Sequence, residues 1–355
     1  MLNVVFFINS LYNAGGTERI STLLANKMVS DGYNVSFIVI YNGGVPFFSL
    51  SEKIQIHYLN NRGKGSIYLH YLQYLYLYRK MIKRIKPDYI IDVCSAMSLI
   101  TIPATIGLKV SVISWEHFNA NVDWNPITSR LARYMAAKLA NKIVVLTNDD
   151  KSIFERKYKA SNVVCIPNAV TIEVSKPSML VEKKVLAIGR FTRQKGFDML
   201  LQAWGLVKCK EYGWVLQIVG QGELKDELIE IAQRLKIMDT VTFNEPIQDV
   251  RLYYEMSSIY VMSSRFEGLP LVLLEALAMG LPIISFNCET GPKDLVDDGV
   301  TGVLVEPNNV TQLALEIDSL AMDRERREMY STNALKKSCD YKMDSIIEKW
   351  KKIIK

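Results

Sequence analysis

Two glutamates, Glu267 and Glu275, lie eight positions apart in the largely apolar stretch RFEGLPLVLLEALAMGLPIIS (residues 265–285). An α-helix turns about 100° per residue, so one helix would place these side chains roughly 80° apart and could not present both on one face. The preceding SIYVMSS predicts a buried strand, and Pro270 is favoured in the first turn of a helix. We therefore expect a turn at residues 265–268 and a helix from about 270 to 279, with Glu267 in the turn and Glu275 inside the helix.

This arrangement suits two carboxylates that bind different parts of one long ligand. Between them, Gly268 and the backbone N–H groups near Leu271 and Val272 lie at the start of the helix. Such N–H groups have no partner within the helix and can form a binding site for a phosphate. The alternative is a loop-capping acid at 267 and a chance surface glutamate at 275.

A second cluster, AIGRFTRQKGFDMLLQAW, follows the first predicted strand of the C-terminal half. Arg190 comes directly after Gly189, and Lys195 precedes a predicted helix. Two cations beside the positive end of a helix dipole are favourable when a polyanion lies there. Ordinary solvated cations in the first turn of a helix are the alternative.

A third cluster, FINSLYNAGGTERISTLLANKM, predicts a strand, a glycine turn and a helix. Gly15 and Gly16 would allow the backbone to approach a ligand closely, although a tight turn without a ligand is also compatible with them. The pattern is not GxGxxG, and VGQGEL at 219–224 lacks its third glycine, so a nicotinamide cofactor is poorly supported.

Glu116 and His117 follow the predicted strand VSVISW, at the edge of a parallel sheet where ligands bind. His117 is one of 3 histidines, and a structural role is the alternative. The sequence has no HxxxH, CxxC or DxD pair in a suitable setting, which predicts no metal site. It also lacks GxSxG, which disfavours a serine hydrolase.

Charge is distributed unevenly along the 355 residues, whose net charge is +6. Residues 1–170 contain 19 Lys and Arg against 10 Asp and Glu, whereas residues 171–355 are mildly acidic. The Tyr-rich stretch 65–87 predicts a helix with Arg79, Lys80, Lys83 and Arg84 towards its end. Tyrosines beside cations suit an anionic membrane surface, and a core helix with a solvated end is the alternative.

The chain alternates predicted strands and amphipathic helices throughout, which indicates an α/β fold with mostly parallel sheets. We expect two doubly wound Rossmann-like domains facing a central cleft, with the linker at 166–184. The expected domains are residues 1–168 and 169–340, followed by a terminal helix at 341–355 that packs back on the N-terminal domain. That helix carries Ile346, Ile347, Trp350 and Ile354 on one stripe.

Composition places the chain in the cytoplasm. Its 5 cysteines are scattered, odd in number and typical of reduced thiols. The N-terminus has no basic leader, and no apolar stretch reaches the roughly 18 residues that a membrane-spanning helix needs.

Together these motifs resemble the retaining glycosyltransferases of family 4, which have the GT-B fold. Glu267 and Glu275 match the family's E-x7-E signature. The stretches GRFTRQKG and AGGTER look like its diphosphate-binding motif and N-terminal glycine loop, and IPNAV, IVGQGEL and NCETGPKDLVDDGVTGVLV follow in the expected order. The family often has Asn-Gly where this chain has Asn168-Ala169.

The resemblance implies a role for each matching residue. Glu275 would bind the nucleotide ribose and Glu267 the donor sugar, while Arg190 and Lys195 would neutralise the departing diphosphate. Gly189, Gly268, Leu271 and Val272 would belong to the donor site, with Gly15 and Gly16 closing on the diphosphate. His117 would lie near the sugar or acceptor.

For the whole chain, the resemblance implies metal-independent, retaining transfer of a hexose or N-acetylhexosamine. The implied donor is a nucleotide-diphosphate sugar, expected to be UDP-linked, and no cofactor is expected. The acceptor would be a glycan or a polyprenyl-diphosphate-linked glycan, as in assembly of polysaccharide, lipopolysaccharide or O-antigen. The enzyme would work in the cytoplasm, peripheral on the inner face of the cytoplasmic membrane.

Several rival functions stay open on sequence grounds. A nucleotide-sugar epimerase or phosphorylase of the same fold would use similar residues, and a non-catalytic nucleotide-sugar binding module would need only some of them. A Rossmann oxidoreductase lacks its glycine fingerprint here, and the basic residues lack the base-stacking motifs of a nucleic-acid binder.

Overall fold

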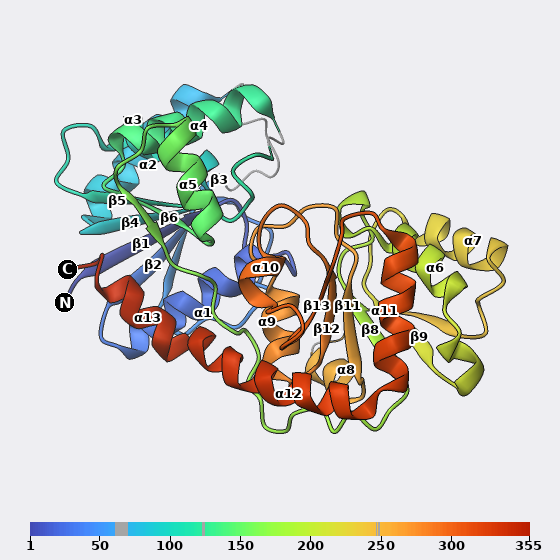
Figure 1. Cartoon of the computed structure of the whole chain (residues 1–355). Helices are drawn as coiled ribbons and strands as arrows, with labels where there is room; N and C mark the ends of the chain where they lie inside the picture. Colours follow the sequence, from blue (N-terminus) through green and yellow to red (C-terminus); the bar gives the residue numbers. More distant parts are fainter. Residues whose placement is uncertain (61–69, 123–124, 246, 248) are drawn as a thin grey trace. The chain divides into compact units, whose positions relative to one another are not determined.

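The computed structural model describes residues 1–60, 70–122, 125–245, 247 and 249–355 (Figure 1). The chain divides into two units. Unit 1 comprises Met1–Ala169 and Met343–Lys355, and unit 2 comprises Val170–Lys342. These boundaries fall one to two residues after those expected from the sequence.

Unit 1 is built on a sheet whose paired strands are all parallel, in the order β3-β2-β1-β4-β5-β6-β7. Its strands are β1 (Asn3–Ile8), β2 (Asn34–Tyr41), β3 (Gln55–Asn60), β4 (Tyr89–Val93), β5 (Ser111–Trp115), β6 (Lys142–Val145) and β7 (Val163–Cys165). The central strands read as continuous apolar runs because helices cover both faces of the sheet.

The sequence prediction missed β3. This strand, QIHYLN, lies at the edge of the sheet and pairs only with β2 among the described strands. An edge strand is partly solvated and alternates polar with apolar residues, so it lacks the apolar run that marked its neighbours.

Helices of unit 1 are α1 (Gly16–Ser30), α2 (Tyr71–Ile85), the 3-10 turn η1 (Ser95–Met97), α3 (Ser98–Thr105), α4 (Pro126–Leu139), α5 (Asn148–Lys157) and α13 (Met343–Lys351). Helices α2, α3 and α4 pack side by side over one face of the sheet (Figure 1). The expected helix at 65–87 is observed from Tyr71, and its residues 65–69 lie outside the described part of the chain.

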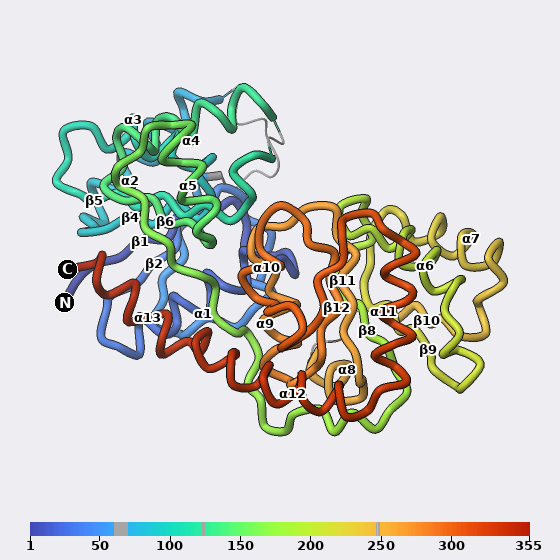
Figure 2. Tube along the Cα trace, viewed as in Figure 1, coloured from blue at the N-terminus to red at the C-terminus, as the bar shows by residue number. Residues whose placement is uncertain are grey.

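The C-terminal helix α13 packs beside α1, as the trace shows (Figure 2). Lys27 of α1 pairs with Asp344 (2.9 Å), and Lys351 pairs with Asp31 (2.8 Å). The stripe of Ile346, Ile347, Trp350 and Ile354 is buried, and Trp350 packs edge-on against Trp115 of β5 with ring centroids 4.9 Å apart. The last helix therefore supports the strand that precedes His117.

Unit 2 repeats the architecture, with a parallel sheet in the order β10-β9-β8-β11-β12-β13. Its strands are β8 (Lys184–Ile188), β9 (Val215–Val219), β10 (Val241–Asn244), β11 (Ile259–Met262), β12 (Ile283–Phe286) and β13 (Gly302–Val305). Its helices are η2 (Arg193–Lys195), α6 (Phe197–Leu206), η3 (Cys209–Tyr212), α7 (Lys225–Arg234), α8 (Arg251–Glu255), α9 (Leu271–Ala278), α10 (Pro292–Leu295), α11 (Val310–Met322), α12 (Arg324–Ser338) and η4 (Cys339–Tyr341).

The expected linker at 166–184 has no helix or strand before β8, but much of it packs against unit 2. The Val170 N–H donates to the Tyr341 carbonyl (2.8 Å), and the Ser178 N–H donates to the Met279 carbonyl (2.9 Å). Ile172 and Leu180 are buried. The segment is therefore an ordered part of the fold and not a free tether.

Among the described helices, none is both long and apolar enough to cross a membrane.

A buried acid joins β4 to α3 in unit 1. Asp92 is fully buried and accepts hydrogen bonds from Thr101 Oγ1 (2.5 Å) and Ser98 Oγ (2.8 Å). Burial raises its pKa to about 7, although the two hydroxyl donors act in the opposite direction.

Asp92 therefore predicts a pH-dependent stability. An unfolded carboxyl titrates near 3.8, so between about pH 4 and pH 7 the folded chain binds more protons than the unfolded chain. Stability should fall as the pH rises through this window, and Asp92→Asn, which cannot ionise, should remove that fall. Above pH 7 the gain relative to wild type is expected to be on the order of 4 kcal/mol at most.

Urea unfolding at about pH 5 and about pH 8 measures this difference. Asp340→Asn, at an exposed carboxylate, is the matched control. An identical pH dependence in wild type and Asp92→Asn would show that the Asp92 carboxyl does not titrate in this range.

Candidate donor and acceptor sites

In unit 2, the loops after β8 and β11 meet through an ion pair. Lys195 Nζ lies 2.6 Å from Glu267 Oε1, and both side chains are largely buried. The two strands are neighbours in the sheet, so their carboxyl ends bring these loops together. The structure therefore joins two of the residues predicted from separate motifs.

Two glycines allow this close approach. Gly196 has φ +64 and ψ 27, and a Cβ there would lie 2.1 Å from the Ser263 carbonyl oxygen. At Gly189, a Cβ would lie 3.1 Å from the Lys195 side chain. The glycine at 196 is required by both its left-handed backbone and the space available.

Arg265, which the sequence indicated only as part of a turn, strengthens the contact between the loops after β8 and β11. Its guanidinium binds Asp198 of α6 with two hydrogen bonds (2.9 and 2.7 Å) and donates to the Arg193 carbonyl (2.8 Å). Gln194 Nε2 donates to the Phe266 carbonyl (3.1 Å). A two-point Arg–carboxylate pair fixes geometry as well as adding energy, so the Lys195 and Glu267 loops form one rigid unit.

Helix α9 begins close to this pair. It starts at Leu271, and the N–H groups of Leu271 and Val272 precede the first that can bond within the helix. Gly291, with φ +94, approaches the Gly268 carbonyl so closely that a Cβ would lie 2.0 Å from its oxygen. Thr290 Oγ1 donates to the Glu267 carbonyl (2.6 Å). The turn that carries Glu267 is thus held from several sides.

Glu275 lies inside α9, as predicted, and only 2% of its surface is exposed. Its carboxylate accepts a hydrogen bond from Tyr254 Oη (2.7 Å) and another from Thr171 Oγ1. The alternative that Glu275 is a chance surface residue is wrong. It is a buried carboxylate bound by hydroxyl groups, whereas Glu267 is bound by a cation.

Arg190 differs from Lys195 in its surroundings. Its side chain is exposed at the end of β8 and, within the described chain, pairs with no carboxylate. Its neighbour Phe191 is fully buried, so the backbone here is anchored while the guanidinium extends into solvent. Arg190 is therefore available to bind an anionic ligand.

In unit 1, the glycine loop after β1 leads into α1, as predicted. Gly15 precedes the helix and Gly16 is its first residue. A Cβ on Gly15 would lie 2.2 Å from Glu18 Oε2, so the Glu18 side chain folds back over the helix start. Asn13 Nδ2 donates to the same carboxylate (3.3 Å).

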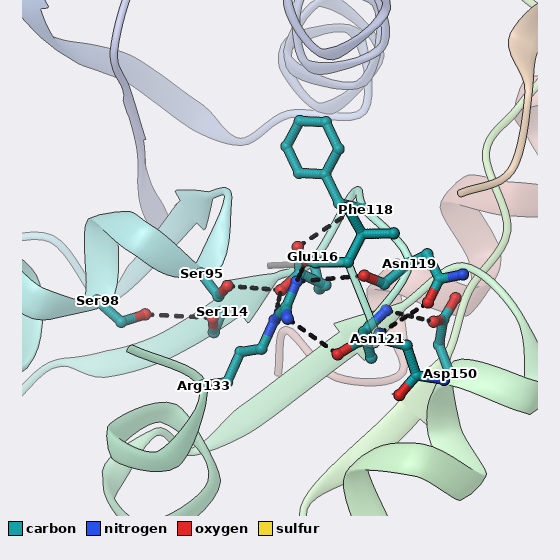
Figure 3. A network of polar contacts seen from close by, with 11 residues as sticks. Ser95, Ser98, Ser114, Glu116, Phe118, Asn119, Asn121, Arg133 and Asp150 are labelled. Carbon is teal, nitrogen blue, oxygen red and sulfur yellow. Dashed lines mark hydrogen bonds and ion pairs between the residues drawn. The ribbon is translucent and has the colours of Figure 1, made fainter. Parts of the chain in front are cut away.

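The loop after β5 is held by a buried ion pair (Figure 3). Arg133 of α4 lies with its Nε 2.9 Å from Glu116 Oε2, and their side chains are 3% and 2% exposed. Ser95 Oγ also donates to Glu116 Oε2 (2.6 Å), and the Phe118 N–H donates to Oε1 (3.2 Å). In Figure 3 the Phe118 ring projects away from this charged cluster.

Arg133 also binds the loop backbone. Its guanidinium donates to the carbonyls of Asn119 (3.3 Å), Ala120 (2.9 Å) and Val122 (3.2 Å). Burial lowers the pKa of Arg133, but the Glu116 carboxylate raises it further, so the net pKa lies above its usual value. Asp150 adds a further anchor by accepting from the Ala120 N–H (2.9 Å). Arg133 thus fixes the whole stretch that contains His117.

His117 is buried beside Trp115, with ring centroids 4.3 Å apart. Burial lowers its pKa to about 3, so the imidazole is neutral at physiological pH. Its Nε2 is a buried polar atom with no hydrogen-bond partner among the described residues. A neutral imidazole with one unused nitrogen can exchange a hydrogen bond with a ligand hydroxyl, but it cannot provide a positive charge.

The four basic residues predicted in α2 have different surroundings. Arg79 donates to the carbonyls of Ala104 (2.6 Å) and Ile106 (2.9 Å), so it caps the C-terminal end of α3. The expected role of Arg79 at a membrane surface stays a prediction. Lys80, Lys83 and Arg84 are exposed.

Among the described residues, no group of three or more His, Cys, Asp or Glu side chains has the arrangement of a metal site. Cys94 is half-buried, and the pKa of its thiol is raised to about 12, mainly by desolvation and then by the charge of Glu116, so the thiol is unreactive.

Sequence reasoning missed Arg133, Tyr254 and Thr171. Arg133 could have been identified from the sequence, because it lies on the buried face of α4 with Ala132 and Ala136. A cation on an apolar helix face requires a buried acid. Tyr254 and Thr171 reach Glu275 through the tertiary fold from 21 and 104 positions away, and no local pattern marks them.

Two Rossmann-like units with polar groups at the carboxyl ends of their strands are characteristic of ligand-binding α/β enzymes. The chain also matches two family models. Residues 14–174 match Glycosyltransferase Family 4, and residues 171–337 match glycosyl transferases group 1. An uncharacterized glycosyltransferase of Haemophilus influenzae is 39% identical over 100% of both chains.

A second relative, from Campylobacter jejuni, is 30% identical over 100% of this chain and 98% of its own. It is named as an N-acetyl-D-galactosaminyltransferase acting on a glycan linked to undecaprenol through PP. This protein therefore belongs to the glycosyltransferases, with relatives in polysaccharide and lipid-linked glycan synthesis.

A solved structure supports the fold. The crystal structure of an S. aureus TarM mutant in complex with fondaparinux, α-GlcNAc-glycerol and UDP superimposes with a TM-score of 0.84. The sequences are 15% identical, and 99% of each chain is covered. The predicted α/β fold class, GT-B with two Rossmann-like domains, is confirmed.

The two cations of unit 2 should respond differently to removal. Arg190→Ala should leave the free energy of unfolding within about 0.5 kcal/mol of wild type, because the side chain is exposed. Lys195→Ala should destabilise the chain by about 3–5 kcal/mol, because it leaves Glu267 charged and buried. Lys195→Ala with Glu267→Gln should recover part of this loss. Urea unfolding measures all three, and equal stability of the two single variants would contradict the ion-pair assignment.

A parallel prediction concerns unit 1. Arg133→Met should cost about 3–5 kcal/mol, since it leaves the buried Glu116 carboxylate without its cation. Combining it with Glu116→Gln should restore stability in part. Lys138→Met, an exposed change on the same helix, is the control. Strictly additive effects of the Arg133 and Glu116 changes in a double-mutant cycle would show that the two groups do not interact.

Proposed function

We propose that this glycosyltransferase transfers a hexose or N-acetylhexosamine from a UDP-sugar to a polyprenyl-diphosphate-linked glycan, with retention of the anomeric configuration. The observation that carries the proposal is the Lys195–Glu267 ion pair beside the exposed Arg190. It puts two cations and a carboxylate at the carboxyl edge of the unit 2 sheet, where a diphosphate and its sugar would need them.

The donor is bound by unit 2. Arg190 and Lys195 pair with the diphosphate, and each charge-assisted hydrogen bond contributes about 1.5–3 kcal/mol. The N–H groups of Leu271 and Val272 offer further donors at the start of α9. Glu275, already bound by hydroxyl groups of the protein, accepts hydrogen bonds from the ribose hydroxyls. UDP in the TarM crystal structure supports a uridine nucleotide.

The reaction breaks the bond between the anomeric carbon and the diphosphate oxygen, and it forms a bond from that carbon to the acceptor oxygen. The acceptor proton passes to the departing phosphate, so no protein base is required. Negative charge grows on the leaving diphosphate, and Arg190 and Lys195 stabilise it. These side chains supply the neutralisation that a metal ion would otherwise supply, which is the basis for proposing metal independence.

Glu267 orients the sugar. Its carboxylate is fixed by Lys195 and by the turn before α9, so it can accept hydrogen bonds from sugar hydroxyls in one geometry. In unit 1, the neutral His117 is proposed to bind a hydroxyl of the sugar or the acceptor through its unused Nε2.

The relatives support the proposed acceptor class. The C. jejuni protein is named for a glycan on PP-undecaprenol, and its similarity extends over the whole of this chain. A lipid-linked acceptor would place the enzyme in the cytoplasm, peripheral on the inner face of the cytoplasmic membrane. A glycan free of lipid is the simpler acceptor to test against it.

The proposal predicts that UDP-sugars raise the melting temperature of the chain in a thermal-shift screen. At about 100 times the dissociation constant, stabilisation should reach about 2.7 kcal/mol. Glu275→Gln should weaken nucleotide binding, and Glu230→Gln on the exposed side of α7 should not. Arg190→Ala should lower kcat by about 10²–10³ with a smaller effect on binding.

Turnover of the best-binding donor with a lipid-diphosphate acceptor then tests the chemistry. Transfer should persist in EDTA, and the product should keep the anomeric configuration of the donor by NMR. Sugar conversion without an acceptor would indicate an epimerase, and an inverted product would refute retention. Loss of transfer in EDTA that returns with a divalent cation would refute metal independence.

A further inference from the structure

A surface cavity of unit 2 lies at the opposite edge of the sheet from the candidate donor site. Its volume is about 330 Å³, near the lower limit for small-molecule sites. Its walls come from the loop before β8, the segment before β9, and the corner where α11 passes into α12 (Figure 1). Because β8 and β9 are parallel, these segments meet at the amino edge of the sheet, whereas Lys195 and Glu267 follow the carboxyl ends of their strands.

A buried arginine lines this cavity. Two arginines are buried in the described chain, Arg133 in unit 1 and Arg327 in unit 2, with 3% and 7% of their surfaces exposed. Arg133 pairs with the Glu116 carboxylate. Arg327 pairs with no carboxylate among the described residues, and its contacts are to carbonyls and to an aromatic ring. Since a buried cation is normally paired with an anion, the cavity is the place where such a partner is missing.

The contacts of Arg327 satisfy only part of its guanidinium. Nη1 donates to the carbonyls of Leu320 (2.8 Å) and Ala321 (2.7 Å), at the end of α11. The guanidinium also lies over the Trp214 ring, with Cζ 5.2 Å from the ring centroid. Nε is buried and has no hydrogen-bond partner in the described part of the chain. These contacts fix the side chain, but they leave its positive charge and part of its donor capacity for another group.

The surroundings of Arg327 do not offset its charge. Burial lowers its pKa, and the neighbouring charge of Arg324 lowers it further. Asp323 and Glu328 act in the opposite direction, but the pKa stays below its usual value. Both arginines lie within the first four residues of α12, where the helix dipole is also positive. An anion bound here would relieve repulsion that the protein alone leaves in place.

Two exposed cations, Lys183 and Arg324, also line the cavity. Lys183 Nζ donates to the Tyr212 carbonyl (2.9 Å), and Arg324 pairs with the exposed Glu328 on its own helix (2.8 Å). The one acid among the lining residues is Glu182, which is exposed and lies 3.8 Å from a lysine outside the cavity. The lining therefore has three cations against one acid.

The rest of the lining is largely apolar. Leu180 and Ala321 are buried, whereas Val181 and Met322 are 64% and 59% exposed. An inorganic ion would use the cations and leave this apolar surface in water. The combination therefore suits an anion that carries a small apolar group.

We propose that this cavity binds a small organic anion, in which a carboxylate or a phosphate monoester is attached to an apolar body. The anionic oxygens accept hydrogen bonds from Arg327, and Lys183 and Arg324 add positive charge around them. The planar guanidinium suits such oxygens because it can donate two parallel hydrogen bonds. The apolar body packs against Leu180 and Met322. This site is separate from the donor site, so it does not depend on the proposed function.

Titration of the full chain with benzoate and with phenyl phosphate, followed by NMR of the ligand, tests the proposal. Benzamide is the neutral control, since it has nearly the shape of benzoate without its charge. Wild type should bind at least one of the two anions about tenfold or more tightly than benzamide. The difference should shrink at high salt, and the preferred anion identifies the group that the site recognises.

Met322→Asp should weaken binding of that anion about tenfold or more, because it places a like charge beside the ligand. The Met322 side chain is exposed, so the variant should fold normally. Leu315→Asp, at an exposed position of α11 outside the cavity, is the matched control and should bind as wild type does.

Lys183→Gln with Arg324→Gln should weaken binding about fivefold. Arg234→Gln with Lys236→Gln, at exposed positions of unit 2 outside the cavity, should leave binding unchanged.

Arg327→Gln should abolish detectable anion binding. Because it also removes the bonds to the end of α11, circular dichroism and the thermal shift with UDP-sugar must show that the variant is folded. Arg190→Ala should bind the anion as wild type does, which separates a failure of this site from a failure of the proposed donor site.

Three results would overturn the proposal. Benzamide that binds as tightly as both anions would make the cavity an apolar pocket without a role for charge. Wild type that binds neither anion would leave Arg327 as a structural link between α11 and α12. Equal anion binding by Met322→Asp and Leu315→Asp would place the bound anion elsewhere.

Discussion

The ion pair between Lys195 and Glu267 is the interaction on which the candidate site of unit 2 depends. A lysine side chain loses up to about 2 kcal/mol of conformational freedom when it is fixed, and here the partner carboxylate and the surrounding loops fix it during folding. The diphosphate of the proposed donor would then meet a cation that is already in place. Such preorganisation is the largest electrostatic contribution available to a reaction that develops negative charge. The geometry of the Lys195–Glu267 pair also depends on Gly196 and on Arg265, which ties the two loops together.

Unit 1 also contains a buried ion pair, but this pair has a different role. Glu116 and Arg133 are more deeply buried than Lys195 and Glu267, and Arg133 also donates hydrogen bonds to backbone carbonyls. A pair with so little exposure has no capacity left for a ligand, so its role is to hold the loop. The group left for chemistry is His117, which burial keeps neutral. In unit 2, Lys195 and Glu267 hold the loops and could also contact the proposed substrate. In unit 1, the Glu116–Arg133 pair holds the loop, and a different side chain, His117, would contact the ligand.

Much of this could be predicted from the sequence, because the fold rests on local patterns. Apolar β-branched runs predicted every described strand except β3, which lies at a sheet edge and lacks such a run. The turn before α9 and the position of Glu275 inside that helix followed from Pro270. The partners of these residues could not be predicted, since Thr171 and Tyr254 reach Glu275 only through the folded chain. The contacts of Arg79 could not be predicted for a related reason: its carbonyl partners at the end of α3 belong to another helix.

The spacing of Glu267 and Glu275 can now be understood physically. Eight residues place one carboxylate in a turn, beside a lysine, and the other about one turn into α9, beside the hydroxyl groups of Tyr254 and Thr171. A carboxylate paired with a cation is already largely neutralised, so it can orient a sugar without repelling the diphosphate next to it. A carboxylate surrounded by neutral hydroxyl groups keeps its charge and would repel a nearby phosphate, which suits a position beyond it, at the ribose. The two environments thus favour one direction of the proposed donor along the start of α9, with the sugar at Glu267 and the nucleoside at Glu275.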